Sequence, residues 1–189
     1  LGTGNITLGN NADLTLAVTS TGGRLGINSV SGTGTANVTL AGTTSGDARI
    51  DLLTNGTAIS VPTTITGATT GLVGYVATGI TGAVIAGDIT NNSTKTTMVG
   101  TSGGGSMVVN GIIGGTASVQ FSGGGSGGSG SVTLNAANTY GGATTFNAGN
   151  TFTLKLGVTN ALPIATAVYM ANSSGNGGIL DLNGFDQTI

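Results

Sequence analysis

The sequence predicts an all-β fold, and within that class a parallel β-helix, or β-solenoid, whose short strands coil around one core. Segments in which apolar and polar residues alternate recur along the whole chain, and Gly-Gly, Asn-Gly, Gly-Asn and Ser-Gly pairs separate them. Charged residues make up only 5% of the chain, whereas hydrophobic residues make up 38%. A period of two sends alternate side chains to opposite faces of a strand, and glycine allows sharp bends between strands.

Each alternating segment is expected to be a strand, because β-branched residues are frequent in it and no helical period competes. In chain order the segments are residues 5–8 (Asn-Ile-Thr-Leu), 13–16, 37–40, 49–52, 118–121, 132–134, 152–154 and 180–182. Their centres follow one another at roughly 10 to 13 residues, a spacing shared by β-sandwiches, jelly rolls and solenoids.

Three features favour the solenoid over a β-sandwich or jelly roll. Charged residues are scarce, and Thr and Asn are abundant and can form hydrogen-bonded ladders between coils. Strands of the type x-Thr-Leu also recur, so that identical residues can stack on one another in successive coils. We expect coils of roughly 20 to 25 residues that stack into eight or nine rungs about 4.8 Å apart. The sandwich stays open as an alternative, above all for residues 1–122.

The chain divides into three parts on composition. Residues 1–122 and 132–189 carry the strand pattern, and residues 123–131 between them are a Gly/Ser-rich run, read as a surface loop or a linker. A charge-free apolar stretch, residues 72–87, is interrupted by glycines and is too short to span a bilayer. We therefore expect two buried strands there and no membrane span.

The residue inventory argues against an enzyme. The chain contains no histidine, cysteine or glutamate, so a His-activated nucleophile and a His- or Cys-based metal site are impossible. We assign no catalytic, cofactor-binding or metal-binding residues and expect no cofactor. Four isolated basic residues and a net charge of −2 offer no footprint for nucleic acid.

Two groups of acidic residues need a separate interpretation. Asp47 and Asp51 stand on either side of Arg49, and an exposed pair of opposite charges is the expected interpretation. Residues 181–186 (Asp-Leu-Asn-Gly-Phe-Asp) supply oxygen atoms around an Asn-Gly turn, as calcium loops do, but the closing glutamate is missing. A plain turn is the expected structure there.

Residues 131–149 read Ser-Val-Thr-Leu-Asn-Ala-Ala-Asn-Thr-Tyr-Gly-Gly-Ala-Thr-Thr-Phe-Asn-Ala-Gly, which resembles the autotransporter-associated β-strand repeat of bacterial passenger domains. Residues 161–163 and 178–189 are similar to later strands of that repeat, whereas residues 1–122 share only its general style. The resemblance implies a right-handed parallel β-helix without catalytic residues, exported to the cell surface or beyond. It also implies roles for six residues: Leu134 and Phe146 in the core, Tyr140 stacked on a turn, and Gly141, Gly142 and Gly149 as turn formers.

These observations predict a structural protein, a segment or subunit of an extracellular or cell-surface filament, stalk or surface layer. Neither end of the sequence offers a capping helix, so we expect each end of the solenoid to pair with a neighbour by strand addition. The partner is then another copy of the chain, or more of the same polypeptide. The alternative is an adhesive module that presents a loop to a surface glycan.

Overall fold

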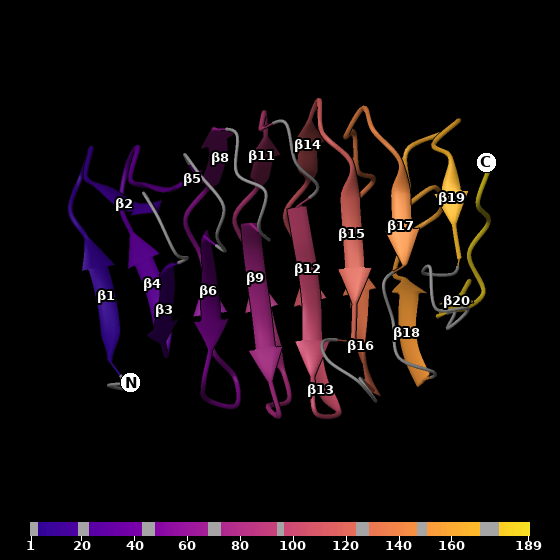
Figure 1. Ribbon diagram of the computed structural model, residues 1–189, viewed down its shortest axis with the longest axis horizontal. Helices are drawn as coiled ribbons and strands as arrows, with labels where there is room; N and C mark the ends of the chain where they lie inside the picture. The colour runs from indigo at the N-terminus through magenta and orange to yellow at the C-terminus, as the bar shows by residue number, and fades with distance from the viewer. Residues whose placement is uncertain are drawn as a thin grey trace.

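The computed structural model describes residues 4–18, 23–42, 48–67, 73–93, 97–123, 129–146, 151–170 and 178–189. Within these ranges the chain forms strands, turns and bends and no helix. The strands stack side by side along one axis, with the N-terminus at one end of the rod and the C-terminus at the other (Figure 1). The predicted all-β fold is therefore confirmed.

Three parallel sheets form the sides of the rod. Sheet A contains β1 (Asn5–Leu8), β4 (Ser29–Gly32), β7 (Ala58–Ile59), β10 (Ala83–Ile85), β13 (Gly105–Val109), β16 (Ser129–Leu134), β18 (Thr151–Leu156) and β20 (Ile179–Asp181). Sheet B contains β2 (Asp13–Val18), β5 (Asn37–Gly42), β8 (Thr63–Gly67), β11 (Ile89–Asn91) and β14 (Ile113–Gly115). Sheet C contains β3 (Gly23–Ile27), β6 (Ala48–Leu52), β9 (Val73–Thr78), β12 (Thr97–Ser102), β15 (Val119–Ser122), β17 (Thr144–Phe146) and β19 (Val168–Tyr169).

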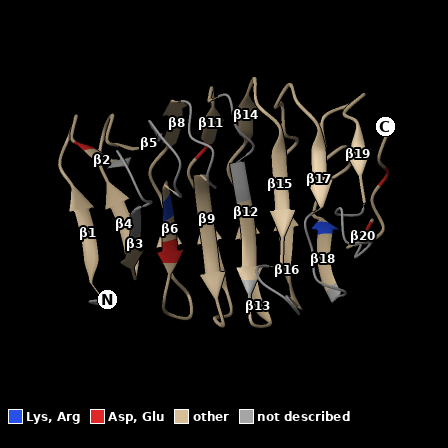
Figure 2. Cartoon of the chain, in the orientation of Figure 1, with Lys and Arg blue, Asp and Glu red and all other residues tan. Residues whose placement is uncertain are grey.

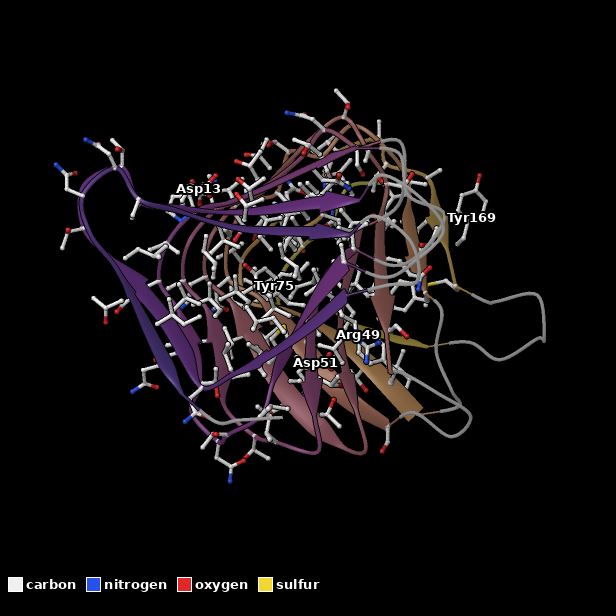
Figure 3. The ribbon with its side chains drawn as sticks, turned by 60° about the vertical axis from the view of Figure 1, so that its left-hand side comes forward. Asp13, Arg49, Asp51, Tyr75 and Tyr169 are labelled. Atoms are coloured by element: carbon white, nitrogen blue, oxygen red, sulfur yellow. The ribbon has the colours of Figure 1, made fainter. Side chains whose placement is uncertain are left out.

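The first five coils place a strand in sheet A, then in sheet B, then in sheet C, whereas the coils that begin with β16 and β18 place strands in sheets A and C only. In Figure 1 the chain advances from left to right, sheet C strands such as β9 and β12 run downward in front, and sheet A strands run upward behind them. The view toward the N-terminal end shows the first coil turning clockwise as it recedes (Figure 3). The solenoid is therefore right-handed. The sandwich alternative is wrong, because the strand pairings between described residues are parallel from β1 to β20, including those within residues 1–122.

Inward side chains form apolar columns that run along the axis. One column, in sheet C, joins Ile50, Tyr75, Val99, Phe121 and Phe146 through register pairs, and these side chains are at most 2% exposed. Another, in sheet A, contains Ile59, Ile85, Val109, Leu134 and Leu156. Burial of each such side chain contributes about 1.5–3 kcal/mol, so the columns provide most of the driving force for coiling. Leu134 and Phe146 are thus core residues, as predicted.

Outward polar side chains on sheet B bond from coil to coil. Asp13 accepts hydrogen bonds from Thr39 on the next coil at 2.9 and 3.0 Å, and the Asn37 amide lies 3.4 Å from the same carboxylate. Thr64, one coil farther, donates to Asn37 at 3.3 Å. The register also aligns Thr15, Thr39, Thr64 and Thr90 in one row. The predicted Thr/Asn ladders are therefore present on this face.

Two glycines allow the coils to pack closely where sheet A turns into sheet B. A Cβ built on Gly87 would lie 2.1 Å from the Val61 carbonyl oxygen, and one on Gly111 would lie 2.2 Å from that of Gly87. Both distances are far below van der Waals contact. Only glycine fits at these two stacked positions, because a side chain would force the coils apart.

The Gly/Ser-rich run does not interrupt the stacking on either side of it. Residues 124–128 lie outside the described residues, but β16 begins at Ser129 and pairs with β13, and β15 pairs with β17. The apolar stretch at residues 72–87 contains β9 in sheet C and β10 in sheet A, in agreement with the two buried strands expected there. Among the described residues, no helix is long and apolar enough to cross a membrane.

Candidate functional site

Charged side chains are few and spread along the rod (Figure 2), and those on β6 form an ion pair. Arg49 Nε lies 2.8 Å from Asp51 Oδ1, and the two side chains are 15% and 8% exposed. They are two residues apart on one strand and therefore share its outward face, where Figure 3 shows them side by side. The predicted pairing of Arg49 with Asp51 is confirmed, but the expectation that the pair is exposed is wrong, since both side chains are largely buried. Asp47 lies outside the described residues.

The acidic turn at residues 181–186 uses its polar atoms within the protein. The Asn183 backbone N–H donates to Asp181 Oδ1 at 2.9 Å, and the Asn183 side-chain amide donates to the Leu156 carbonyl at 3.0 Å. Lys155 Nζ lies 3.9 Å from the second Asp181 oxygen, on the neighbouring strand. This is the geometry of an Asx-type turn tied to the coil below it. In the ranges that the structure describes, no three His, Cys, Asp or Glu side chains gather as metal ligands.

Two tyrosines bring hydroxyl groups into the core. Tyr75 bonds to Thr63 at 2.5 Å, and Tyr140 bonds to Thr144 at 2.6 Å. Burial raises the pKa of both phenols well above the usual tyrosine value, and the threonine hydrogen bonds oppose this only in part. The Tyr140 side chain is 2% exposed and belongs to the hydrophobic core. The Tyr75 hydroxyl joins β9 to β8, and the Tyr140 hydroxyl joins the segment before β17 to that strand.

Exposed large apolar side chains gather at the C-terminal end of the rod. Seven such residues occur among the described residues, and six of them lie in the last two coils: Ile164, Tyr169, Met170, Ile179, Leu182 and Ile189. Two of these continue inward columns. The register pairs Lys155 with Asp181 and Thr145 with Tyr169, so its extension by one residue aligns Leu182 with Leu156 and Met170 with Phe146. Leu182 is 45% and Met170 38% exposed, whereas Leu156 is fully buried and Phe146 is 2% exposed. The end coils thus lack the cover that every inner coil receives.

The N-terminal end shows the same feature. Its edge strands are β1, β2 and β3, each paired on one side only within the described structure. Inward residues Ile6, Leu14, Leu16 and Leu25 pack against the core but are only partly buried. An edge strand of this kind presents unpaired N–H and C=O groups together with an uncovered apolar row. Within the described residues, both end coils therefore present edge strands and a partly covered apolar row.

At the C-terminal end of the rod, the sheets end at different coils. Sheet A reaches β20, and residues 182–189 continue along the side of the rod that sheet B occupies. Asn160 N–H donates to the Asp186 carbonyl at 2.8 Å, and the Gln187 amide makes two hydrogen bonds, of 2.9 and 3.1 Å, with the backbone of Leu162. Sheet C ends one coil earlier, at β19. The outer edge of β19 therefore has no neighbouring strand among the described residues, although sheet A continues one coil farther.

The candidate functional site is thus the pair of open ends, and the sequence predicted it only in outline. The absence of a capping helix and the strand pattern at both ends indicated open edges. The step at β19 depends on how many strands each sheet holds, which the sequence pattern does not reveal. No protein-family model, no curated protein and no solved structure matches this chain.

Proposed function

We propose that this chain is a structural segment or subunit of an extracellular or cell-surface filament, stalk or surface layer, which extends by strand pairing at its ends. The observation that carries the proposal is the pair of open ends: columns buried to 0–2% inside the rod end in residues such as Leu182, at 45% exposure. A further coil, from another copy or from the same polypeptide, would cover them.

Mechanical stiffness follows from the same architecture. Each inner strand is bonded to a strand on either side, and the apolar columns and outward ladders run in the same axial direction. A load along or across the rod is therefore shared by backbone hydrogen bonds and packed side chains at every coil. The resemblance of residues 131–189 to the passenger-domain repeat supports an exported location.

The adhesive alternative predicts a different assembly state. A module that only presents a ligand-binding loop needs no end-to-end contact, so it would stay monomeric at high concentration and bind a glycan. The structural proposal instead predicts filaments. Their axial repeat should be roughly 35–40 Å per chain, because sheet A stacks eight strands about 4.8 Å apart.

Electron microscopy of the purified chain tests the proposal. Filaments with this axial repeat, formed without added ligand, would support it. Discrete particles one chain long at every concentration, together with binding on a glycan array, would contradict it and favour the adhesive module.

A further inference from the structure

Three Asn-Gly pairs lie among the described residues: Asn55-Gly56, Asn110-Gly111 and Asn183-Gly184. In such a pair the glycine backbone nitrogen can attack the side-chain amide carbon of the asparagine, and glycine hinders the attack least because it has no Cβ. The attack needs an exposed amide, a glycine N–H that no hydrogen bond holds, and room for the peptide plane to turn. The three pairs share one sequence but differ in these respects.

The Asn183-Gly184 pair meets all three conditions. It forms the centre of a tight turn after β20, which a hydrogen bond of 2.8 Å from the Phe185 N–H to the Leu182 carbonyl closes. Both residues of the pair are exposed, and a Cβ built on Gly184 would meet nothing within 4 Å. The N–H groups of Asn183 and Phe185 are the backbone donors of this turn, and the Gly184 N–H between them is not one of them.

The backbone of this turn also favours ring closure. Asn183 and Gly184 have φ values of 51° and 84°, as in a type I′ turn. Attack by the Gly184 nitrogen closes a five-membered ring and turns the peptide plane after Asn183, as in a type II′ turn. The first central residue of a type II′ turn also has positive φ, so the flip of one peptide plane is sufficient.

The Asn110-Gly111 pair lacks the room for such a flip. Gly111 is buried, and a Cβ built on it would lie 2.2 Å from the Gly87 carbonyl oxygen. The N–H groups of Asn110 and Gly111 both donate to the Ile85 carbonyl, at 2.8 and 3.3 Å. The stacked coil therefore fixes this peptide plane.

The Asn55-Gly56 pair is exposed, but Thr81 on the next coil binds both of its reacting groups. The Thr81 N–H donates to Asn55 Oδ1 at 2.9 Å, and the Gly56 N–H donates to the Thr81 carbonyl at 3.1 Å. The glycine nitrogen must leave this hydrogen bond before it can attack. Asn55 should therefore react more slowly than Asn183.

We infer that Asn183 is a site of spontaneous covalent modification, at which asparagine converts through a succinimide into isoaspartate and aspartate. The Gly184 nitrogen loses its proton and forms a bond to Asn183 Cγ. The bond from Cγ to Nδ2 breaks, and the amide nitrogen leaves as ammonia with a proton in place of the one lost. Water then opens the ring at either carbonyl, which leaves one new carboxylate. Solvent water is the only co-reactant.

The modification should detach this turn from the coil below it. Asn183 Nδ2 donates to the Leu156 carbonyl at 3.0 Å, and conversion replaces this donor with a carboxylate oxygen. The new charge also lies beside Asp181, which already accepts from the Asn183 N–H. Isoaspartate further adds one carbon to the backbone inside the turn that the Phe185 N–H closes. The inference does not depend on the proposed assembly.

Incubation of the purified folded chain at neutral pH, followed by peptide mass spectrometry, tests the inference. The conversion replaces an NH2 group with OH, fragmentation assigns that mass change to a residue, and an isoaspartyl methyltransferase labels isoaspartate. We expect Asn183 to convert first and Asn110 to convert about 100-fold more slowly, the effect of misplacing reacting groups by about 1 Å. Fragmentation also separates Asn183 from Asn176, which precedes Gly177 and lies outside the described residues.

The same chain unfolded in urea is the matched control. The three pairs should then convert at similar rates, because only the fold distinguishes them. N183Q should abolish conversion at this turn and leave the other pairs unchanged, since glutamine closes a six-membered ring far less readily. Conversion of Asn110 or Asn55 as fast as that of Asn183 in the folded chain would overturn the assignment. Unchanged hydrogen exchange of the Phe185 amide in the converted chain would overturn the detachment of the turn.

Discussion

The hydroxyl oxygens of Thr63 and Tyr75 lie 2.5 Å apart inside the solenoid, although Thr63 is in sheet B and Tyr75 is in sheet C. Thr63 is 1% exposed and Tyr75 is fully buried, so neither hydroxyl has access to solvent. A buried hydroxyl that loses its partner keeps its desolvation cost without compensation. This hydrogen bond therefore fixes how two sides of the rod meet.

Replacement of Thr63 by valine should lower the free energy of unfolding by about 1–3 kcal/mol, because it leaves the Tyr75 hydroxyl buried without a partner. Urea unfolding followed by circular dichroism measures the change. T64V is the matched control on the same strand, since Thr64 points outward and is only half-buried; its effect should be well below that of T63V. Equal effects of the two variants would contradict the proposed role of the hydrogen bond.

Stability should decline at alkaline pH because of Tyr75 and Tyr140. Burial raises the pKa of both phenols in the folded protein, so the folded state retains protons that the unfolded state releases above about pH 10. The free energy of unfolding is then unaffected below that pH and falls above it by about 1.4 kcal/mol per pH unit for each tyrosine.

Urea midpoints between pH 8 and 11.5 measure this dependence. Replacement of both tyrosines by phenylalanine should make the slope above pH 10 shallower. A slope unchanged by the double substitution would assign the alkaline instability to other groups.

Gly111 should not tolerate alanine, because the added Cβ would lie 2.2 Å from the Gly87 carbonyl oxygen. Overpacking of this kind costs about 1–3 kcal/mol, or more when backbone has to move. G9A serves as the control, since a Cβ on Gly9 meets nothing within 4 Å. Thermal unfolding should show a clear loss for G111A and almost none for G9A; similar melting temperatures for both variants would contradict the close approach of the coils.

The ion pair of Arg49 and Asp51 should show strong coupling. Asp51 is 6% exposed, so R49M leaves a nearly buried carboxylate without its nearest cation and should cost about 3 kcal/mol. The double variant R49M/D51L should recover much of that loss, because it removes both charges and keeps apolar volume. A double-mutant cycle measures the coupling, and strictly additive effects would show that the two side chains do not depend on each other.

About half of the strands were predictable from the sequence, whereas several others, among them β3, β4 and β14, and the register of the sheets were not. Residues 49–52 alternate so clearly that β6 follows from the period of two. Coil length, however, varies: Val30 pairs with Ile59, 29 residues later, but Ser129 pairs with Thr151, only 22 residues later. Because the connections differ in length, strand spacing alone cannot show which side chains share a column. The contact of Thr63 with Tyr75 therefore could not be predicted.

The sequence predicted that strands lie at the ends of the chain, but it did not predict at which coil each sheet ends. Leu180 and Leu182 follow the strand pattern, which indicated a strand at the end of the chain. Sheet C stops at β19, whereas sheet A reaches β20. This difference depends on the stacking of whole coils, which the local pattern does not show. The role of Gln187, whose side-chain amide bonds to the Leu162 backbone, also depends on the fold rather than on any local pattern.

The most direct test of end-to-end assembly places a charge on the uncovered column and measures filament mass by light scattering. Leu182→Arg puts a guanidinium into the joint, whereas Ile112→Arg changes a residue of similar exposure, 42%, away from both ends. We predict that the Leu182 variant stays monomeric at concentrations at which wild type and the Ile112 variant form filaments. Filaments of the Leu182 variant equal to those of wild type would contradict the account.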